Sequence, residues 1–67
     1  MDITVNQQSY SVLPACSLQQ MLSSAIQLQA TGVAIAVNQV IIPKANWESY
    51  ILQPGDQITI IKATQGG

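Results

Sequence analysis

Residues 17–29 read SLQQMLSSAIQLQ and carry the pattern that decides the fold. Apolar side chains recur there three and four positions apart, which is the spacing of one face of an α-helix. These apolar residues are Leu18, Met21, Leu22, Ala25 and Ile26. Ser17 and Gln20 fit a capping box, in which each side chain satisfies a free backbone N–H at the helix start. The sequence therefore predicts a helix from Ser17 to about Gln29, with a turn at Gly32.

A β-hairpin is predicted before this helix. Residues 2–13 alternate polar and apolar side chains on either side of a turn at residues 6–8, which is the period of a strand with one buried face. The buried face would hold four apolar side chains: Ile3, Val5, Tyr10 and Val12. Pro14 breaks the alternation and ends the second strand.

After the helix, two more strands are predicted. Residues 33–37 (VAIAV) are β-rich and too short for a helix. Asn38-Gln39 turns the chain into a strand at residues 40–42, which stops at Pro43. Residues 44–53 are expected to be irregular and to cover the edge of the core with Trp47, Tyr50, Ile51 and Leu52.

The last strand is predicted at residues 57–62, with Ile58 and Ile60 facing inward. It follows Gln53-Pro54-Gly55-Asp56, which has Pro and Gly where a type II turn requires them. The order β-β-α-β-β-β predicts an α+β domain over residues 1–62, with one helix packed across one face of a mixed sheet. Residues 63–67 are expected to be a flexible tail that ends in Gly-Gly.

The composition excludes several classes of function. The chain has 67 residues, 2 basic and 3 acidic side chains, one cysteine and no histidine, so it fits a single domain. Two lysines are too few for nucleic-acid binding, and no apolar run approaches the roughly 20 residues that span a membrane. A single cysteine without histidine builds no zinc site and supports little acid–base catalysis. The chain is therefore expected to act as a substrate or carrier, not as an enzyme.

The final pair Gly66-Gly67 is the most informative feature for function. Glycine has no Cβ, so its backbone can enter a narrow active site that would reject any side chain. Five extended residues reach about 17 Å, enough to cross the rim of a partner's pocket. A terminal carboxylate is ionised at neutral pH and can attack a phosphorus centre. We therefore expect Gly67 to be the covalent site, with Thr64, Gln65 and Gly66 threaded into partner enzymes.

Several motifs resemble the ThiS family of sulfur carrier proteins, which are ubiquitin-like β-grasp domains. They are Val37-Asn38-Gln39-Val40-Ile41-Ile42-Pro43-Lys44, Trp47, Gln53-Pro54-Gly55-Asp56 and the Gly-Gly end. The resemblance covers nearly the whole chain and is strongest from residue 33 onward. It implies a β-grasp fold and a role in making the thiazole of thiamin.

The resemblance also implies a reaction cycle run by partners. An E1-like adenylating enzyme of the ThiF type would use ATP and magnesium to adenylate the Gly67 carboxylate. A persulfide, from a sulfur donor such as a cysteine desulfurase, would then yield a thiocarboxylate, and a thiazole synthase of the ThiG type would take the sulfur. The chain itself would bind no cofactor or metal, no nucleic acid and no membrane, and would work in the cytoplasm.

Two other functions share the main features. The small subunit of molybdopterin synthase has the same fold and the same Gly-Gly end, and a ubiquitin-like interaction module could carry an inert tail. On the surface, alternation places Ile61 on the face away from the helix, near Ala34 and Ala36, as a possible partner interface. Cys16 is interpreted as a small half-buried side chain, in preference to a reactive thiol activated by the helix that follows it.

Overall fold

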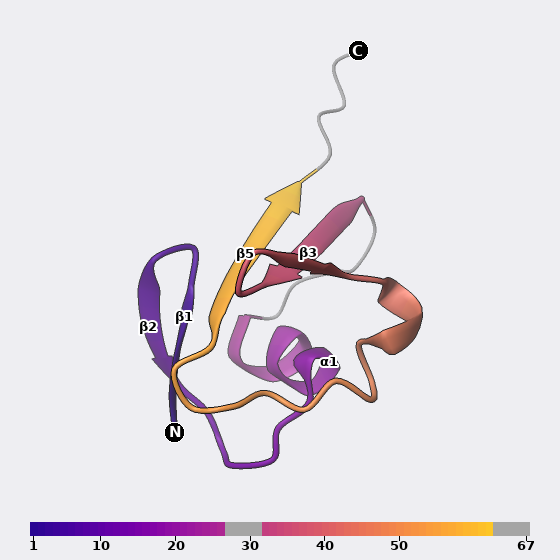
Figure 1. Ribbon diagram of the computed structural model, residues 1–67. Coiled ribbons are helices and arrows are strands. Elements are labelled where there is room, and N and C mark those ends of the chain that lie inside the picture. The colour runs from indigo at the N-terminus through magenta and orange to yellow at the C-terminus, as the bar shows by residue number, and fades with distance from the viewer. Residues whose placement is uncertain (27–31, 63–67) are drawn as a thin grey trace.

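The computed structural model describes residues 1–26 and 32–62, which form a five-stranded mixed sheet with one short helical segment on one face (Figure 1). The strands are β1 (Asp2–Val5), β2 (Gln8–Ser11), β3 (Val33–Val37), β4 (Val40–Ile42) and β5 (Gln57–Lys62). Their order across the sheet is β2-β1-β5-β3-β4, so the last strand lies in the centre. β5 is parallel to β1 and antiparallel to β3. The predicted α+β fold and its element order are confirmed.

The helix begins where the capping pattern predicts. α1 (Leu18–Met21) starts after Ser17, whose hydroxyl accepts a hydrogen bond from the Gln20 backbone N–H at 3.1 Å. The Gln20 side chain in turn accepts from the Ser17 backbone N–H at 2.9 Å. Leu18, Met21 and Leu22 are buried, so this part of the predicted apolar stripe faces the sheet as expected.

The regular helix is shorter than predicted. α1 ends at Met21, and the chain continues as a π-helical segment, η1 (Leu22–Ile26). The Ser24 hydroxyl donates to the backbone oxygen of Gln20 at 2.7 Å. Such a side-chain bond competes with the helical backbone ladder, which gives a physical reason for the wider turn. Residues 27–29 of the predicted helix lie outside the described residues.

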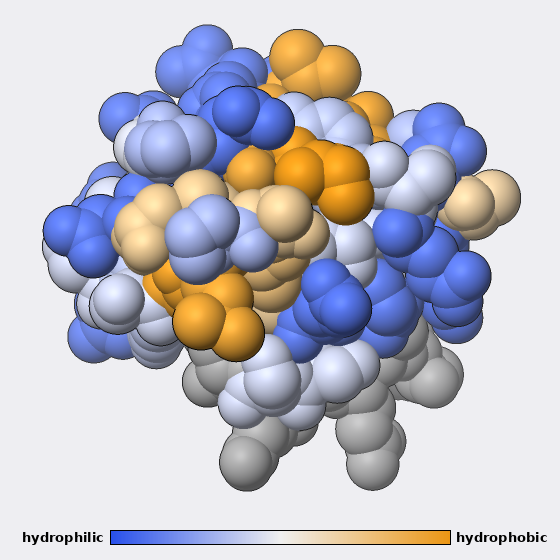
Figure 2. Space-filling model, turned by 90° about the horizontal axis from the view of Figure 1, so that it is seen from below, coloured by the Kyte–Doolittle hydropathy of each residue, from blue (hydrophilic) through white to orange (hydrophobic). Residues whose placement is uncertain are grey.

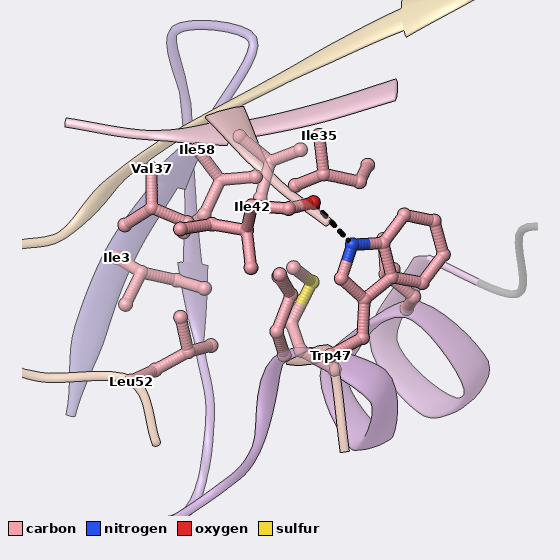
Figure 3. Close-up of a cluster of buried hydrophobic side chains, with 11 residues drawn as sticks. Ile3, Ile35, Val37, Ile42, Trp47, Leu52 and Ile58 are labelled. Atoms are coloured by element: carbon pink, nitrogen blue, oxygen red, sulfur yellow. Dashed lines mark hydrogen bonds between the residues drawn. The ribbon is translucent and has the colours of Figure 1, made fainter. Parts of the chain in front are cut away.

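The core lies between α1 and the sheet face that it covers (Figure 3). Ile3 and Val5 of the first hairpin are buried as predicted, whereas Tyr10 and Val12 are only half-buried. Trp47 closes one side of the core, and its indole N–H donates to the Ile42 carbonyl at 2.9 Å. The largest aromatic ring in the chain is therefore both buried and satisfied in its hydrogen bonding.

The segment between β4 and β5 differs from the prediction at one residue. It contains a 3₁₀ turn, η2 (Lys44–Asn46), and it buries Trp47 and Leu52 as expected. Ile51, however, is 45% exposed and does not cover the core. Ile51 forms an isolated β-bridge with Ser17, and neighbouring residues of an extended chain point to opposite sides, so burial of Leu52 turns Ile51 outward.

The remaining turns follow the sequence. Gly55 has φ 82°, as the third position of a type II turn requires. Its backbone N–H donates to the Asp2 carbonyl at 2.7 Å, which fastens the start of β5 beside β1. Within residues 1–26 and 32–62, no helix has the length and hydropathy needed to cross a bilayer.

Candidate functional site

The central strand extends past one of its neighbours. β1 is paired with β5 only at Gln57 and Ile58, whereas β3 is paired with it from Ile58 to Lys62. Figure 1 shows β5 continuing beyond the β1–β2 hairpin toward the C-terminal end of the chain. Among the described residues, the second half of β5 therefore has a strand partner on one side only. This half leads into the segment that the sequence singled out.

The sheet face away from α1 carries an apolar surface that we call the open face. It consists of Ala34, Ala36, Ile41, Thr59 and Ile61. Ile61 is directly opposite Ala34 in the β3–β5 register and is 48% exposed, while Ala34 is also exposed. The structure thus places all three residues proposed as a partner interface on one face, and two of them are exposed.

The third residue of that proposal contributes little accessible surface. Ala36 is only 6% exposed, because Thr59 and Ile41 lie opposite it on the two neighbouring strands. Ile41 is 55% exposed and belongs to the same face, but the sequence analysis did not select it. The signal was the two-residue turn at Asn38-Gln39, which sets the register that pairs position 41 with position 36. The interface itself stays a prediction.

The electrostatics of the described residues offer little for catalysis. The open face has no charged side chain among its five residues. Asp56 is buried, and its carboxylate accepts hydrogen bonds from the Asn38 side-chain amide at 3.0 Å and the Gln53 backbone N–H at 2.8 Å. Asp2 and Glu48 are exposed. Over residues 1–26 and 32–62, no three His, Cys, Asp or Glu side chains gather in a way that could hold a metal ion.

Cys16 is a half-buried side chain whose thiol donates to the Ser17 carbonyl at 3.3 Å. Burial raises the pKa of this thiol above its ordinary value, because it disfavours the charged thiolate. The thiol therefore remains protonated at neutral pH and is a poor nucleophile. This direction favours the interpretation of Cys16 as a packing residue over the reactive alternative.

The predicted covalent site falls beyond the described part of the chain. Gly67, and with it Thr64, Gln65 and Gly66, lie outside the described residues, as does the predicted tail at 63–67. What the structure does describe is the strand that leads to them and the face beside that strand. Together these features are typical of a small β-grasp carrier domain, which presents a surface and a chain end to other proteins.

Comparisons with known proteins identify the carrier more closely. The ThiS family model matches residues 3–67. The sulfur carrier protein ThiS of Escherichia coli (strain K12) is 36% identical over 67 residues, which is the full length of both chains. The crystal structure of the thiamine biosynthesis protein ThiS from Geobacter metallireducens has a TM-score of 0.82, with 23% identity over the whole of both chains, and it confirms the β-grasp fold. The chain belongs to the ThiS family of sulfur carrier proteins and is a carrier, not a catalyst.

Proposed function

We propose that this chain carries sulfur to the thiazole of thiamin as a thiocarboxylate on Gly67. The observation that carries the proposal is the family match, which runs through Gly66 and Gly67 to the last residue. The same match favours this role over the molybdopterin branch of carriers. The second half of β5 supports it, because this half extends beyond its pairing with β1 and comes directly before the segment proposed to enter a partner's pocket.

The chemistry requires activation of the terminal carboxylate, followed by substitution at its carbon. A carboxylate oxygen of Gly67 attacks the α-phosphorus of ATP on an E1-like enzyme of the ThiF type and displaces pyrophosphate, whose charge magnesium would neutralise. The terminal sulfur of a persulfide then attacks the acyl carbon and displaces AMP. A thiol then cleaves the sulfur–sulfur bond that came from the persulfide, which leaves a thiocarboxylate on Gly67 and a disulfide between that thiol and the donor. Adenylation supplies the leaving group that a bare carboxylate lacks.

The division of labour follows from the side chains. The open face has no acidic or basic side chain among its five residues, so we assign proton transfer to the partners. The carrier contributes a slim backbone and an apolar open face for docking. A cysteine desulfurase is the proposed first source of sulfur, and a thiazole synthase of the ThiG type is the proposed acceptor. The cytoplasm suits this cycle because its reducing conditions keep thiols such as Cys16 unpaired.

The direct test is the intact mass of the chain after incubation with ATP, magnesium, a ThiF-type enzyme and a persulfide donor. We expect the mass to rise by the difference between one sulfur and one oxygen, and only when ATP is present. A chain that lacks Gly67 should gain no sulfur and should melt at the same temperature as the full chain. An unchanged mass of the full chain, with an enzyme that loads the E. coli protein, would contradict the proposal.

A matched pair of variants tests whether partners dock on the open face. Ile61 and Ile51 are exposed to similar extents, 48% and 45%, but only Ile61 lies on the open face. Ile61→Asp should slow ATP-dependent AMP formation about tenfold or more, because burial of an isoleucine contributes roughly 1.5–3 kcal/mol. Ile51→Asp should leave the rate unchanged. Equal effects of the two variants would remove the open face from the docking surface.

The dependence on salt provides a second check on docking. The open face has no charged residue, so its affinity for a partner should rest on apolar contact. The KM for the carrier in the AMP assay should therefore change little between low and high ionic strength. A steep rise of KM with salt would show that charges outside this face dominate the encounter.

A further inference from the structure

One edge of the sheet is prepared for pairing with another strand. β2 is the outermost strand beyond β1, and its register with β1 runs from Val5 opposite Gln8 to Asp2 opposite Ser11. Met1 and Val12 then exchange two hydrogen bonds, at 2.7 and 2.9 Å. In an antiparallel pair, hydrogen-bonded and non-hydrogen-bonded positions alternate. The backbone N–H and C=O groups of Ser9 and Ser11 therefore point away from β1, toward the open edge.

The other edge of the sheet is much less suited to pairing. β4 has only three residues and ends at Pro43, so the same alternation leaves Ile41 as its single outward-facing position. Short length and a nearby proline are the common ways in which natural sheets protect an edge. β2 is only one residue longer, but it has two outward-facing positions and contains no lysine, no proline and no bulge. Pro14 keeps Leu13 extended beyond the end of the strand.

A groove adjoins the open edge. It has a volume of ≈ 750 Å³ and lies between the end of β2, the loop that follows and the helical segment, with Ser11, Leu13, Cys16, Gln20 and Ser24 in its lining. No charged side chain is among the described residues that line it. Leu13 is 80% exposed at its rim, the most exposed large hydrophobic side chain described. Figure 2, which views this end of the molecule, shows hydrophobic side chains exposed among hydrophilic ones.

The chemistry of the edge and the groove selects one kind of occupant. An extended backbone would satisfy the outward groups of Ser9 and Ser11, and an uncharged groove favours an uncharged apolar side chain at the Leu13 end. A second copy fits poorly. Two β2 strands paired antiparallel would place the polar Gln8 end of one copy beside the apolar groove of the other.

We propose that β2 is a docking edge for an extended, uncharged segment of a partner protein, which adds a strand beside Ser9 and Ser11 and places an apolar side chain against Leu13. β1 separates this edge from β5. The segment therefore binds without covering Ile61 or the strand that leads to Gly67. The carrier can hold one partner through β2 while its C-terminal end is engaged by another. This site does not depend on the proposed sulfur chemistry.

The test uses a defined probe, a capped six-residue peptide of alternating threonine and valine with leucine at its last position. It is titrated to millimolar concentration against the full ¹⁵N-labelled chain. We expect the amide signals of Ser9, Ser11 and Leu13 to shift and the Ser11 amide to exchange more slowly. The same peptide with N-methylated backbone amides should not bind, because it cannot complete the ladder.

Two variants and one matched control locate the site. Ser11→Pro removes the outward N–H and should weaken peptide binding about tenfold, roughly the worth of one hydrogen bond. Leu13→Asp changes only an exposed side chain, so the core stays intact and the variant should fold normally. It should weaken peptide binding as much as Ser11→Pro does. Ile41→Pro removes the outward N–H of the other edge and should leave binding unchanged.

Each contrary result overturns the proposal. The first is that amide signals shift at β4 instead of β2, and the second is that no signal shifts at millimolar peptide. The third is that the peptide binds the Leu13→Asp variant as tightly as the original chain. A dimer in sedimentation that Ser11→Pro abolishes would show that a second copy occupies the edge.

Discussion

The two hairpins of this protein share the tripeptide Val-Asn-Gln and the same turn, yet they serve the sheet differently. Residues 5–7 and 37–39 carry the repeat. Asn6 and Asn38 have φ 49° and 51°, and the glutamines that follow both have φ 71°. Left-handed conformation at both central residues is the mark of a type I′ turn, which matches the twist of paired strands. The two copies of the tripeptide therefore form two similar strand ends.

The two asparagines each hold β5, but at different places. Asn6 accepts a hydrogen bond from the Ile60 backbone N–H at 2.9 Å, beyond the point where β1 stops pairing. Asn38 accepts from the Gln57 N–H at 3.0 Å and donates to the Asp56 carboxylate at 3.0 Å, at the start of the strand. The first therefore extends a short parallel ladder, while the second stabilises the turn before β5 through its buried residue, Asp56.

This difference shows that a local motif fixes a turn but not its role. Asparagine tolerates the left-handed region because its short polar side chain can form hydrogen bonds nearby. Which atoms it meets depends on the strand that the rest of the chain brings alongside. Val5 and Val37, just before the two turns, both face Ile58 across the ladders, so the hairpins meet at one core residue.

The largest loss of stability is expected from a substitution at Ile58, where the two hairpins meet. Ile58→Ala removes a buried side chain between the two hairpins and should lower the free energy of unfolding by about 2–5 kcal/mol. Urea unfolding followed by Trp47 fluorescence measures it. Ile61→Ala, on the exposed side of the same strand, should change stability by no more than about 0.5 kcal/mol. Similar losses from both would mean that Ile58 is not the shared anchor.

Replacing either asparagine should have an intermediate effect on stability, and the cost should be larger for Asn38 than for Asn6. Glycine keeps the left-handed turn but removes the side-chain hydrogen bonds. Asn38→Gly should cost about 1–3 kcal/mol, because it also leaves the buried Asp56 carboxylate with one partner fewer. Asn6→Gly should cost about 0.5–1.5 kcal/mol, since one hydrogen bond is lost. The same denaturation assay ranks them, and a reversed order would break the comparison.

The smallest expected effect is a gain in stability on replacing Gln7 or Gln39 with glycine, and it should be equal in both turns. Gln7 and Gln39 hold a conformation that costs an L-residue roughly 1–2 kcal/mol, while glycine loses about 0.5–1 kcal/mol of chain entropy on folding. Gln7→Gly and Gln39→Gly should therefore each stabilise the domain by about 0.5 kcal/mol, seen as a small rise in Tm. Unequal gains would indicate that one glutamine side chain has a tertiary contact.

Most of the fold was predictable because its signals are local. The capping box of Ser17 and Gln20, the alternation in β5 and the turn at Gly55 each depend on residues only a few positions apart. The π-helical segment after Met21 was missed because the Ser24 hydroxyl bond has no periodic signature. Ile51 was placed wrongly because hydrophobicity alone does not say which of two adjacent residues turns inward.

The site was predicted in part for the same reason. Alternation placed Ile61 on the sheet face away from the helix, and the register between β3 and β5 pairs it with Ala34. The burial of Ala36 and the exposure of Ile41 depend on neighbouring strands, which a single strand's pattern does not contain. The docking edge at β2 was not foreseen, since the unpaired backbone of an edge strand is invisible until the strand order is known.

The sequence by itself determined where strands, helix and turns begin, because steric limits and side-chain period act over a few residues. It also set the sparse charge and the Gly66-Gly67 pair, from which a carrier was predicted. Only the tertiary structure decided that β5 lies between β1 and β3, that Asn6 reaches Ile60 across 54 positions, and which sheet edge stays open. Those outcomes depend on packing between distant segments, and no local pattern encodes which segment will become a neighbour.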